Sequence, residues 1–161
     1  MSIRKIKKVI FIYCEGESEK NYFEALKGNK LISNNYVLKP NSNINDLHNA
    51  IEKIERLELD SKTIYIYDSD TYKKGLKKIT EKIEKHKGQI YFSEEEFEDF
   101  LKCHKTKSYY RDKKPNLSRA LVEEIRQLDK NYIKQYIKKP NKYKEFKSIY
   151  DLLMELIENK F

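Results

Sequence analysis

The feature that most constrains the fold is a series of four short apolar runs, each followed by a segment with helical spacing. The runs are residues 9–14, 36–39, 63–67 and 89–92. The first, Val-Ile-Phe-Ile-Tyr-Cys, is apolar without alternation, which is typical of a strand buried on both faces. Parallel neighbours need a crossover connection, and a helix supplies it economically. The sequence therefore predicts an α/β fold with a central, mostly parallel sheet of about four strands flanked by helices.

The helices are predicted from apolar residues that recur every three or four positions. Ser18 is expected to cap the first helix, Pro40 to stop the second strand, and a fourth helix to cover residues 96–104. Beyond it, two more stripes predict helices near the end of the chain. Their members are Leu121, Ile125, Leu128, Tyr132 and Tyr136, then Ile149, Leu152, Leu153, Leu156 and Ile157. We expect an α/β domain over residues 1–104 and a basic helical extension over 105–161, packed together as one unit.

The charge of the chain is unevenly distributed. The 161 residues carry a formal net charge of +8, and residues 1–100 hold 18 basic and 18 acidic side chains. Residues 101–161 hold 16 basic and 8 acidic side chains, so the whole excess lies there. Such asymmetry favours a surface that faces a polyanion such as DNA or RNA, although a solvated basic surface has the same composition.

Three classes of protein are disfavoured. No apolar stretch approaches the roughly 18–20 residues that a membrane-spanning helix needs. Cys14 and Cys103 lack the spacing of a zinc site. The apolar run after the basic start is cut short by Glu15, so we expect no secretion signal and a cytoplasmic location.

Acidic residues follow two of the predicted strands. Glu15 and Glu19 come after the first, and Asp68 and Asp70 come after the third. Ligands of open parallel sheets collect beyond the carboxyl ends of the strands, so these side chains converge if the two strands are adjacent. Gathered carboxylates repel one another unless a cation lies among them, and Mg²⁺ prefers oxygen ligands. We predict a Mg²⁺ (or Mn²⁺) site at Glu15, Glu19, Asp68 and Asp70; solvated loop carboxylates are the simpler alternative.

These motifs resemble the Toprim domain, a metal-binding α/β module of topoisomerases, primases and overcoming-lysogenization-defect nucleases. Glu15-Gly16 resembles its glutamate motif and Asp68-Ser69-Asp70 its Asp-x-Asp motif. Within that group the segment Glu-Gly-Glu-Ser-Glu-Lys-Asn-Tyr-Phe, residues 15–23, is most similar to the RloB-like branch. Residues 97–104, Phe-Glu-Asp-Phe-Leu-Lys-Cys-His, resemble a later motif of that branch, with Phe100 where Trp is usual.

The resemblance implies a Toprim-like (Rossmann-like) fold and Mg²⁺-dependent cleavage of nucleic-acid phosphodiesters. It also implies a role in phage defence or abortive infection beside a partner ATPase. Asp68 and Asp70 would hold the ion at the scissile phosphate, and Glu15 would bind metal or accept a proton from the nucleophile. Glu19 and Glu98 could help to bind a second ion.

The densest basic stretch follows the fourth predicted helix and contains Tyr109 and Tyr110. Cations for phosphates and aromatic rings for stacking are typical of a track for single-stranded nucleic acid. Arg126, Lys130, Lys134 and Lys138 recur every four residues and predict one basic helix stripe. The predicted nucleic-acid contacts are Lys102, His104, Lys105, Lys107, Arg111, Lys113, Lys114 and Arg119. For His104 the alternative is a helix cap or a core partner, which a lone His at a helix end more often is.

Two rival functions stay open. A phosphoacceptor receiver domain also has acids after its first and third strands, but it needs an adjacent acidic pair, a lone Asp and a Lys after a fifth strand. The pattern Asp68-x-Asp70 and the lack of a predicted fifth strand disfavour it. A non-catalytic Toprim-like module that binds a partner or nucleic acid would keep the basic helices and lose the cleavage.

Overall fold

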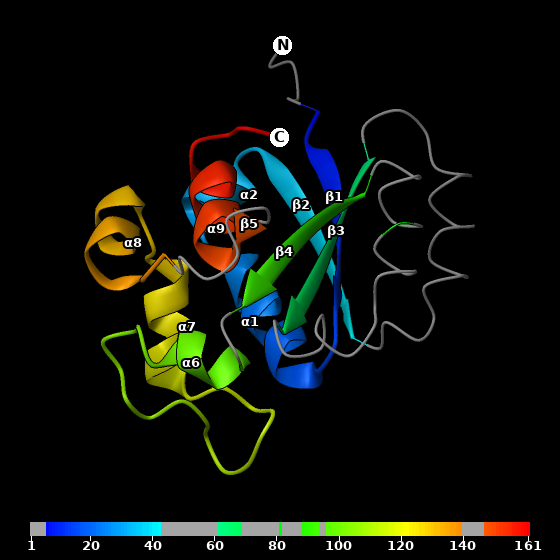
Figure 1. Cartoon of the computed structure of the whole chain (residues 1–161). Helices are drawn as coiled ribbons and strands as arrows, with labels where there is room; N and C mark the ends of the chain where they lie inside the picture. Colours follow the sequence, from blue (N-terminus) through cyan, green and yellow to red (C-terminus); the bar gives the residue numbers. More distant parts are fainter. Residues whose placement is uncertain (1–5, 43–60, 69–80, 82–87, 94–95, 140–146) are drawn as a thin grey trace.

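The computed structural model describes residues 6–42, 61–68, 81, 88–93, 96–139 and 147–161 (Figure 1). Its centre is a parallel sheet of five strands in the order β2-β1-β3-β4-β5. The strands are β1 (Lys8–Cys14), β2 (Tyr36–Ser42), β3 (Ser61–Asp68), β4 (Gln89–Ser93) and β5 (Lys147–Ser148). The predicted α/β class is confirmed, with a Rossmann-like sheet. The expected helices over residues 47–57 and 76–83 lie largely outside the described residues.

The described helices are α1 (Glu17–Leu26), α2 (Lys30–Ser33), α6 (Phe97–Leu101), α7 (Arg119–Arg126), α8 (Lys130–Tyr136) and α9 (Ile149–Ile157). In Figure 1 they lie on one side of the sheet, with the orange-red α9 beside β4 and the blue α1 beneath it. They bury one continuous apolar cluster against the strands. It includes Ile10, Ile12, Ile64 and Ile66 of the sheet and Phe23, Leu26, Leu121, Ile125, Leu152 and Leu153 of the helices.

Two strand predictions were wrong. β5 pairs with β4 through Tyr91 and Lys147, so a fifth strand exists inside the expected helical extension. It is only two residues long, which is too short to leave a pattern in the sequence. β2 continues through Pro40 to Ser42 instead of stopping. It lies at the edge of the sheet, where a strand needs a hydrogen-bond ladder on one side only and proline is tolerated.

The stripe from Leu121 to Tyr136 forms two helices, not one. Asp129 breaks it, because its side chain accepts from the backbone N–H of Tyr132 and caps α8. The predicted single basic stripe is therefore wrong: Arg126 lies in α7, Lys130 and Lys134 in α8, and Lys138 after it. The last helix is as predicted, and a capping box between Ser148 and Asp151 starts it.

Asn29 joins the early helices to α7. Its side-chain oxygen caps α2 by accepting from the backbone N–H of Leu31. Its side-chain amide donates to the backbone carbonyls of Ile125 and Leu128, at 3.1 and 2.9 Å. The residue is 1% exposed, so these bonds replace water entirely. The segment that follows residue 104 is thereby bonded to the first helices through a buried polar contact.

Candidate active site at the carboxyl ends of β1 and β3

The strand order reverses between β1 and β3. β2 lies on one side of β1 and β3 on the other, and Cys14 pairs with Ile66. Glu15, the residue after Cys14, is therefore level with Tyr67 of β3, and Asp68 lies one residue further along that strand. Burial first, then Tyr65 and Glu15, raise the pKa of Tyr67, as expected for neighbours. In open parallel sheets ligands bind outside the carboxyl ends at such a reversal.

The turn from β1 into α1 brings a second carboxylate back to the strand end. The helix is capped by Gly16, not by the predicted Ser18, which lies inside the first turn. Glu19 is in the same turn and only 8% exposed. A Cβ on residue 16 would lie 2.7 Å from Oε2 of Glu19, closer than real contacts allow. The glycine therefore makes room for the Glu19 carboxylate over the end of β1.

This end of the sheet is electrically negative. Burial, then Glu19 and Glu17, raise the pKa of the Cys14 thiol, against a smaller opposite effect of Lys20. Oε1 of Glu15 is buried. Glu17 accepts a hydrogen bond from the Ser42 hydroxyl at the end of β2. Glu17 and Glu19 therefore both lie close enough to Cys14 to add negative potential at the end of β1.

The donor set fits a hard divalent cation in kind, because its polar groups are carboxylates. Asp70 and the side chain of Asp68 lie outside what the structure describes, so half of the predicted ligand set is not placed. Within the described ranges, no three His, Cys, Asp or Glu side chains gather closely enough to hold an ion. Glu15, Glu19, Asp68 and Asp70 therefore stay a predicted site.

Glu98 lies at the start of α6 and reaches this edge through Tyr110. Its Oε1 accepts from the Tyr110 hydroxyl at 3.3 Å and from the Lys114 ammonium. Burial is the largest single effect and raises the pKa of Glu98, but the hydrogen bond and charge of Lys114, a backbone hydrogen bond and the Tyr110 hydroxyl together outweigh it, so the pKa is lowered. The Ser18 side chain, in the first turn of α1, lies close enough to the Tyr110 hydroxyl to lower the pKa of Tyr110, against the larger raising effect of burial. Sequence reasoning assigned Tyr110 to base stacking and missed this bridge.

His104 is a core residue, which corrects its assignment as a nucleic-acid contact. It is 1% exposed, and its Nε2 lies 2.6 Å from the hydroxyl of Tyr22. Its Nδ1 lies 3.1 Å from the carbonyl oxygen of Leu101, and Phe100 packs edge-on against the ring. Burial lowers its pKa, against smaller raising effects of the Leu101 carbonyl and Glu124. Phe97 and Phe100, seven and four positions earlier and thus at helical spacing, are the sequence signal that could have indicated this burial.

The other predicted basic residues are exposed, and their side chains differ in the ion pairs, hydrogen bonds or ring contacts that they make. Lys102 pairs with Asp99 at 3.3 Å, and Lys107 donates to the carbonyls of Lys102 and His104. Lys105 lies over the rings of Tyr132 and Tyr136. The Nε of Arg111 is 3.9 Å from Asp112. Among described residues, Lys113 and Arg119 have no ion-pair partner.

The RloB-like family model matches residues 10–159, which is nearly the whole chain. The chain belongs to the RloB-like family. No curated protein and no solved structure matches it significantly. The family match agrees with the resemblance seen at residues 15–23 and 97–104. The Toprim assignment within it is an interpretation of the same motifs.

One objection to the receiver-domain alternative falls, and two objections stand. A fifth strand exists in this RloB-like chain, so its absence cannot be used against a receiver. However, Cys14 and Gly16 flank Glu15, which leaves no adjacent acidic pair after β1. β5 runs directly into Ile149 and Tyr150, with no lysine at its end. The chemistry that a receiver needs is therefore missing at both places.

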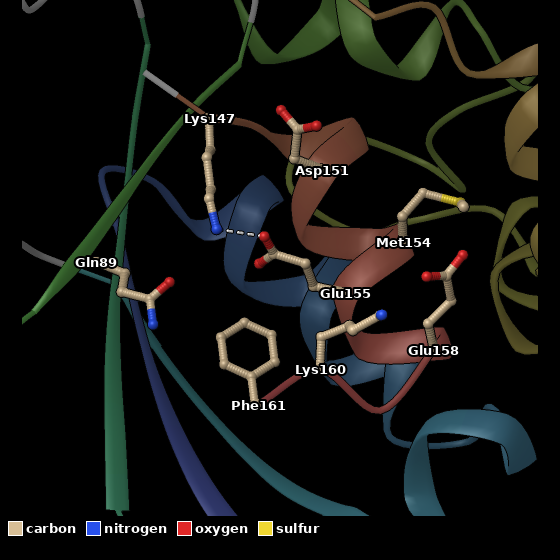
Figure 2. A pocket seen from close by; sticks show the side chains of 8 residues that line it. All are labelled: Gln89, Lys147, Asp151, Met154, Glu155, Glu158, Lys160 and Phe161. Carbon is tan, nitrogen blue, oxygen red and sulfur yellow. Dashed lines mark hydrogen bonds and ion pairs between the residues drawn. The ribbon is translucent and has the colours of Figure 1, made fainter. Parts of the chain in front are cut away.

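A pocket of about 400 Å³ lies at the opposite, amino-terminal edge of the sheet (Figure 2). Its lining includes Gln89 at the start of β4 and Lys147 at the start of β5. Its three carboxylates all have cationic partners: Glu155 pairs with Lys147, Glu158 with Lys130 and Asp151 with Lys139. Each acidic side chain that lines the pocket is therefore tied to a lysine of the RloB-like chain.

No helix among the described residues is long and apolar enough to cross a membrane.

Proposed function

We propose that this RloB-like chain is a Toprim-type, Mg²⁺-dependent nuclease that cleaves nucleic-acid phosphodiesters. The observation that carries the proposal is that Glu15 follows β1 and Asp68 ends β3, two adjacent parallel strands between which the strand order reverses. The effects of Glu19 and Glu17 on Cys14, and of Glu15 on Tyr67, support it. By its resemblance, the chain would act in phage defence, with an ATPase as its partner.

Each group of residues has a distinct role in the proposed reaction. Asp68, Asp70, Glu15 and Glu19 would hold the ion, which when bound offsets negative charge on the scissile phosphate and the leaving oxygen. The Glu15 carboxylate can accept the proton of the attacking water if it is not itself a ligand. The basic segment after α6 would bind the phosphates on either side of the cut.

The decisive comparison is between Glu15→Gln and Glu17→Gln. Both variants remove one carboxylate from the same turn, but Glu17 is held by Ser42 and is no predicted ligand. Plasmid, single-stranded DNA and tRNA are incubated with Mg²⁺ or Mn²⁺, and cleavage is followed on gels. Glu15→Gln should lose about 100-fold in rate or more, and Glu17→Gln only a small factor.

Calorimetric titration with Mn²⁺ gives a second readout that needs no substrate or partner. Glu15→Gln should weaken Mn²⁺ binding about tenfold or more, while Glu17→Gln leaves it near the wild-type value. Equal Mn²⁺ affinity in wild type and both variants would contradict the proposal.

A second candidate is a non-catalytic module that binds nucleic acid or a partner. The exposed Lys113 and Arg119, which have no ion-pair partner in the described part of the chain, favour it. Such a module should bind oligonucleotides equally well with and without Mg²⁺ and leave all three substrates intact.

A further inference from the structure

The segment between α6 and α7 is anchored on the first turns of α1. We name residues 105–116 the basic loop. The amide of Asn21 donates to the carbonyl of Pro115 at 3.0 Å. Ser18 lies near the Tyr110 hydroxyl, and Ser118 holds the base of the loop by donating from its backbone N–H to the Tyr109 carbonyl at 2.9 Å. In Figure 1 this lime-to-yellow segment lies at the same end of the molecule as the strand arrowheads.

Lys114 is the cation of the basic loop that directly precedes Pro115, whose carbonyl accepts from Asn21 of α1. Its ammonium binds Glu98 and lies 5.4 Å from the ring centre of Tyr110. The Tyr110 hydroxyl donates to Glu98, and Ser18, next to Glu19 in the sequence, lies near it. Glu98 and Tyr110 therefore define where the ammonium lies relative to the acidic turn. The Lys114 side chain is still 58% exposed, so an incoming group can reach it.

An exposed ammonium beside a negative site is what a polyanionic substrate needs. The carboxylates at the strand ends repel phosphates, so a nearby fixed cation is required to draw the backbone in. Lys102 and Lys107 are directed elsewhere, to Asp99 and to the carbonyls at the end of α6. The remaining cations of the loop lack a comparable anchor at the acidic turn.

We propose that Lys114 binds a backbone phosphate of the nucleic acid, and that Glu98 and Tyr110 are positioning residues that hold its ammonium beside the first turn of α1. This inference rests on the proposed function, because it assumes a nucleic-acid substrate. It gives Glu98 a role distinct from the predicted second-metal ligand.

The test measures binding without cleavage. Binding of fluorescent single-stranded RNA and DNA oligonucleotides is followed by anisotropy in EDTA over a range of salt concentrations. Lys114→Met should weaken binding about tenfold and reduce the salt slope by about one, while Lys114→Arg restores both. The matched control is Lys130→Met: the Lys130 side chain is 52% exposed and pairs with Glu158, which lines the pocket of the opposite edge, as Lys114 pairs with Glu98.

Glu98→Gln and Tyr110→Phe test the positioning role. Each should weaken oligonucleotide binding about threefold in the wild-type background and have no further effect in the Lys114→Met background. Tighter binding by Glu98→Gln would overturn the positioning role, because it would mean that Glu98 only repels the phosphate. Weaker Mn²⁺ binding by Glu98→Gln at unchanged oligonucleotide affinity would also overturn it, in favour of a metal ligand.

The two proposals can fail separately. If Lys114→Met behaves like Lys130→Met in EDTA while Mg²⁺-dependent cleavage depends on Glu15, this inference fails and the nuclease stands. If Lys114→Met alone weakens binding and no substrate is cut, the nuclease fails and the phosphate contact stands.

Discussion

The acidic residues at the amino ends of the strands (the amino edge) and at their carboxyl ends (the carboxyl edge) have different surroundings. At the amino edge Glu155, Glu158 and Asp151 are each neutralised by a lysine. At the carboxyl edge Glu17 and Glu19 both raise the pKa of Cys14, and Glu15 raises that of Tyr67. The amino-edge ion pairs tie Lys147 of β5 to α9, and Lys130 and Lys139 to the same helix. At the carboxyl edge the acidic side chains act instead on buried groups of β1 and β3, and the proposed nuclease would use that edge.

The largest expected effect is a loss of stability on removal of His104, a core residue behind the carboxyl edge. His104→Ala should lower the free energy of unfolding by about 2–4 kcal/mol, because it leaves a cavity and a buried Tyr22 hydroxyl without its partner. Urea unfolding followed by circular dichroism measures the change. Lys113→Ala, in the exposed basic loop, is the control and should change stability by less than about 0.5 kcal/mol. A His104→Ala protein of wild-type stability with weaker oligonucleotide binding would restore the surface role of His104.

The second prediction concerns pH. The pKa of His104 is lowered in the folded state, chiefly by burial, so the unfolded chain binds the proton more readily. The stability that this adds is present above the unfolded pKa of about 6.5 and is lost as pH falls through the lower folded value. Between pH 7 and pH 5 the wild type should lose stability at up to about 1.4 kcal/mol per pH unit from this group. His104→Gln should flatten this part of the curve, and an unchanged curve would contradict the assignment.

The third prediction tests the amino edge. Glu155 accepts hydrogen bonds from the hydroxyl of Tyr91 and from Lys147. Glu155→Ala should lower the free energy of unfolding by about 1–2 kcal/mol, since the Tyr91 hydroxyl keeps only Gln89, at 2.9 Å. Glu155→Gln, which keeps an acceptor, should lose less. Loss of Mn²⁺ binding in either variant would mean that the two edges are not distinct.

The smallest expected effect is the stability of Glu15→Gln. Removing one negative charge from the crowded strand end should leave the metal-free protein within about 0.5 kcal/mol of the wild type, or more stable. Thermal unfolding in EDTA measures it, with Glu24→Gln on the exposed side of α1 as the control. A large loss of stability would show that Glu15 is a structural residue like Glu155.

The strands were predictable because their signal is local. Continuous apolar runs located β1, β3 and β4, and the start of β2. β5 has two residues and α2 has four, which is too few for a recognisable period of apolar residues in the sequence. The division between α7 and α8 was missed because apolar residues continue through it, although Asp129 before a new helix was a readable cap. Pro40 was misread because the edge position of its strand depends on the whole sheet.

Of the candidate site, the sequence could predict only the residues whose position follows from the order of the strands. Glu15 and Asp68 could be placed at strand ends, and the adjacency of β1 and β3 follows from a common sheet topology. The contacts of Glu98 with Tyr110 and Lys114 join residues 12 and 16 positions apart through a loop without a period. The burial of His104 likewise depends on Tyr22, which lies 82 positions earlier.

The buried amide of Asn29 bears on how this protein can be shortened. A fragment that ended before α7 would leave both N–H groups of that amide facing an apolar interior without the carbonyls of Ile125 and Leu128. Each stranded donor costs about 1–3 kcal/mol, a large share of the stability of an ordinary domain. The residues from α7 onward therefore cover the first part of the chain, and truncation before α7 should yield an aggregating polypeptide instead of a minimal catalytic unit.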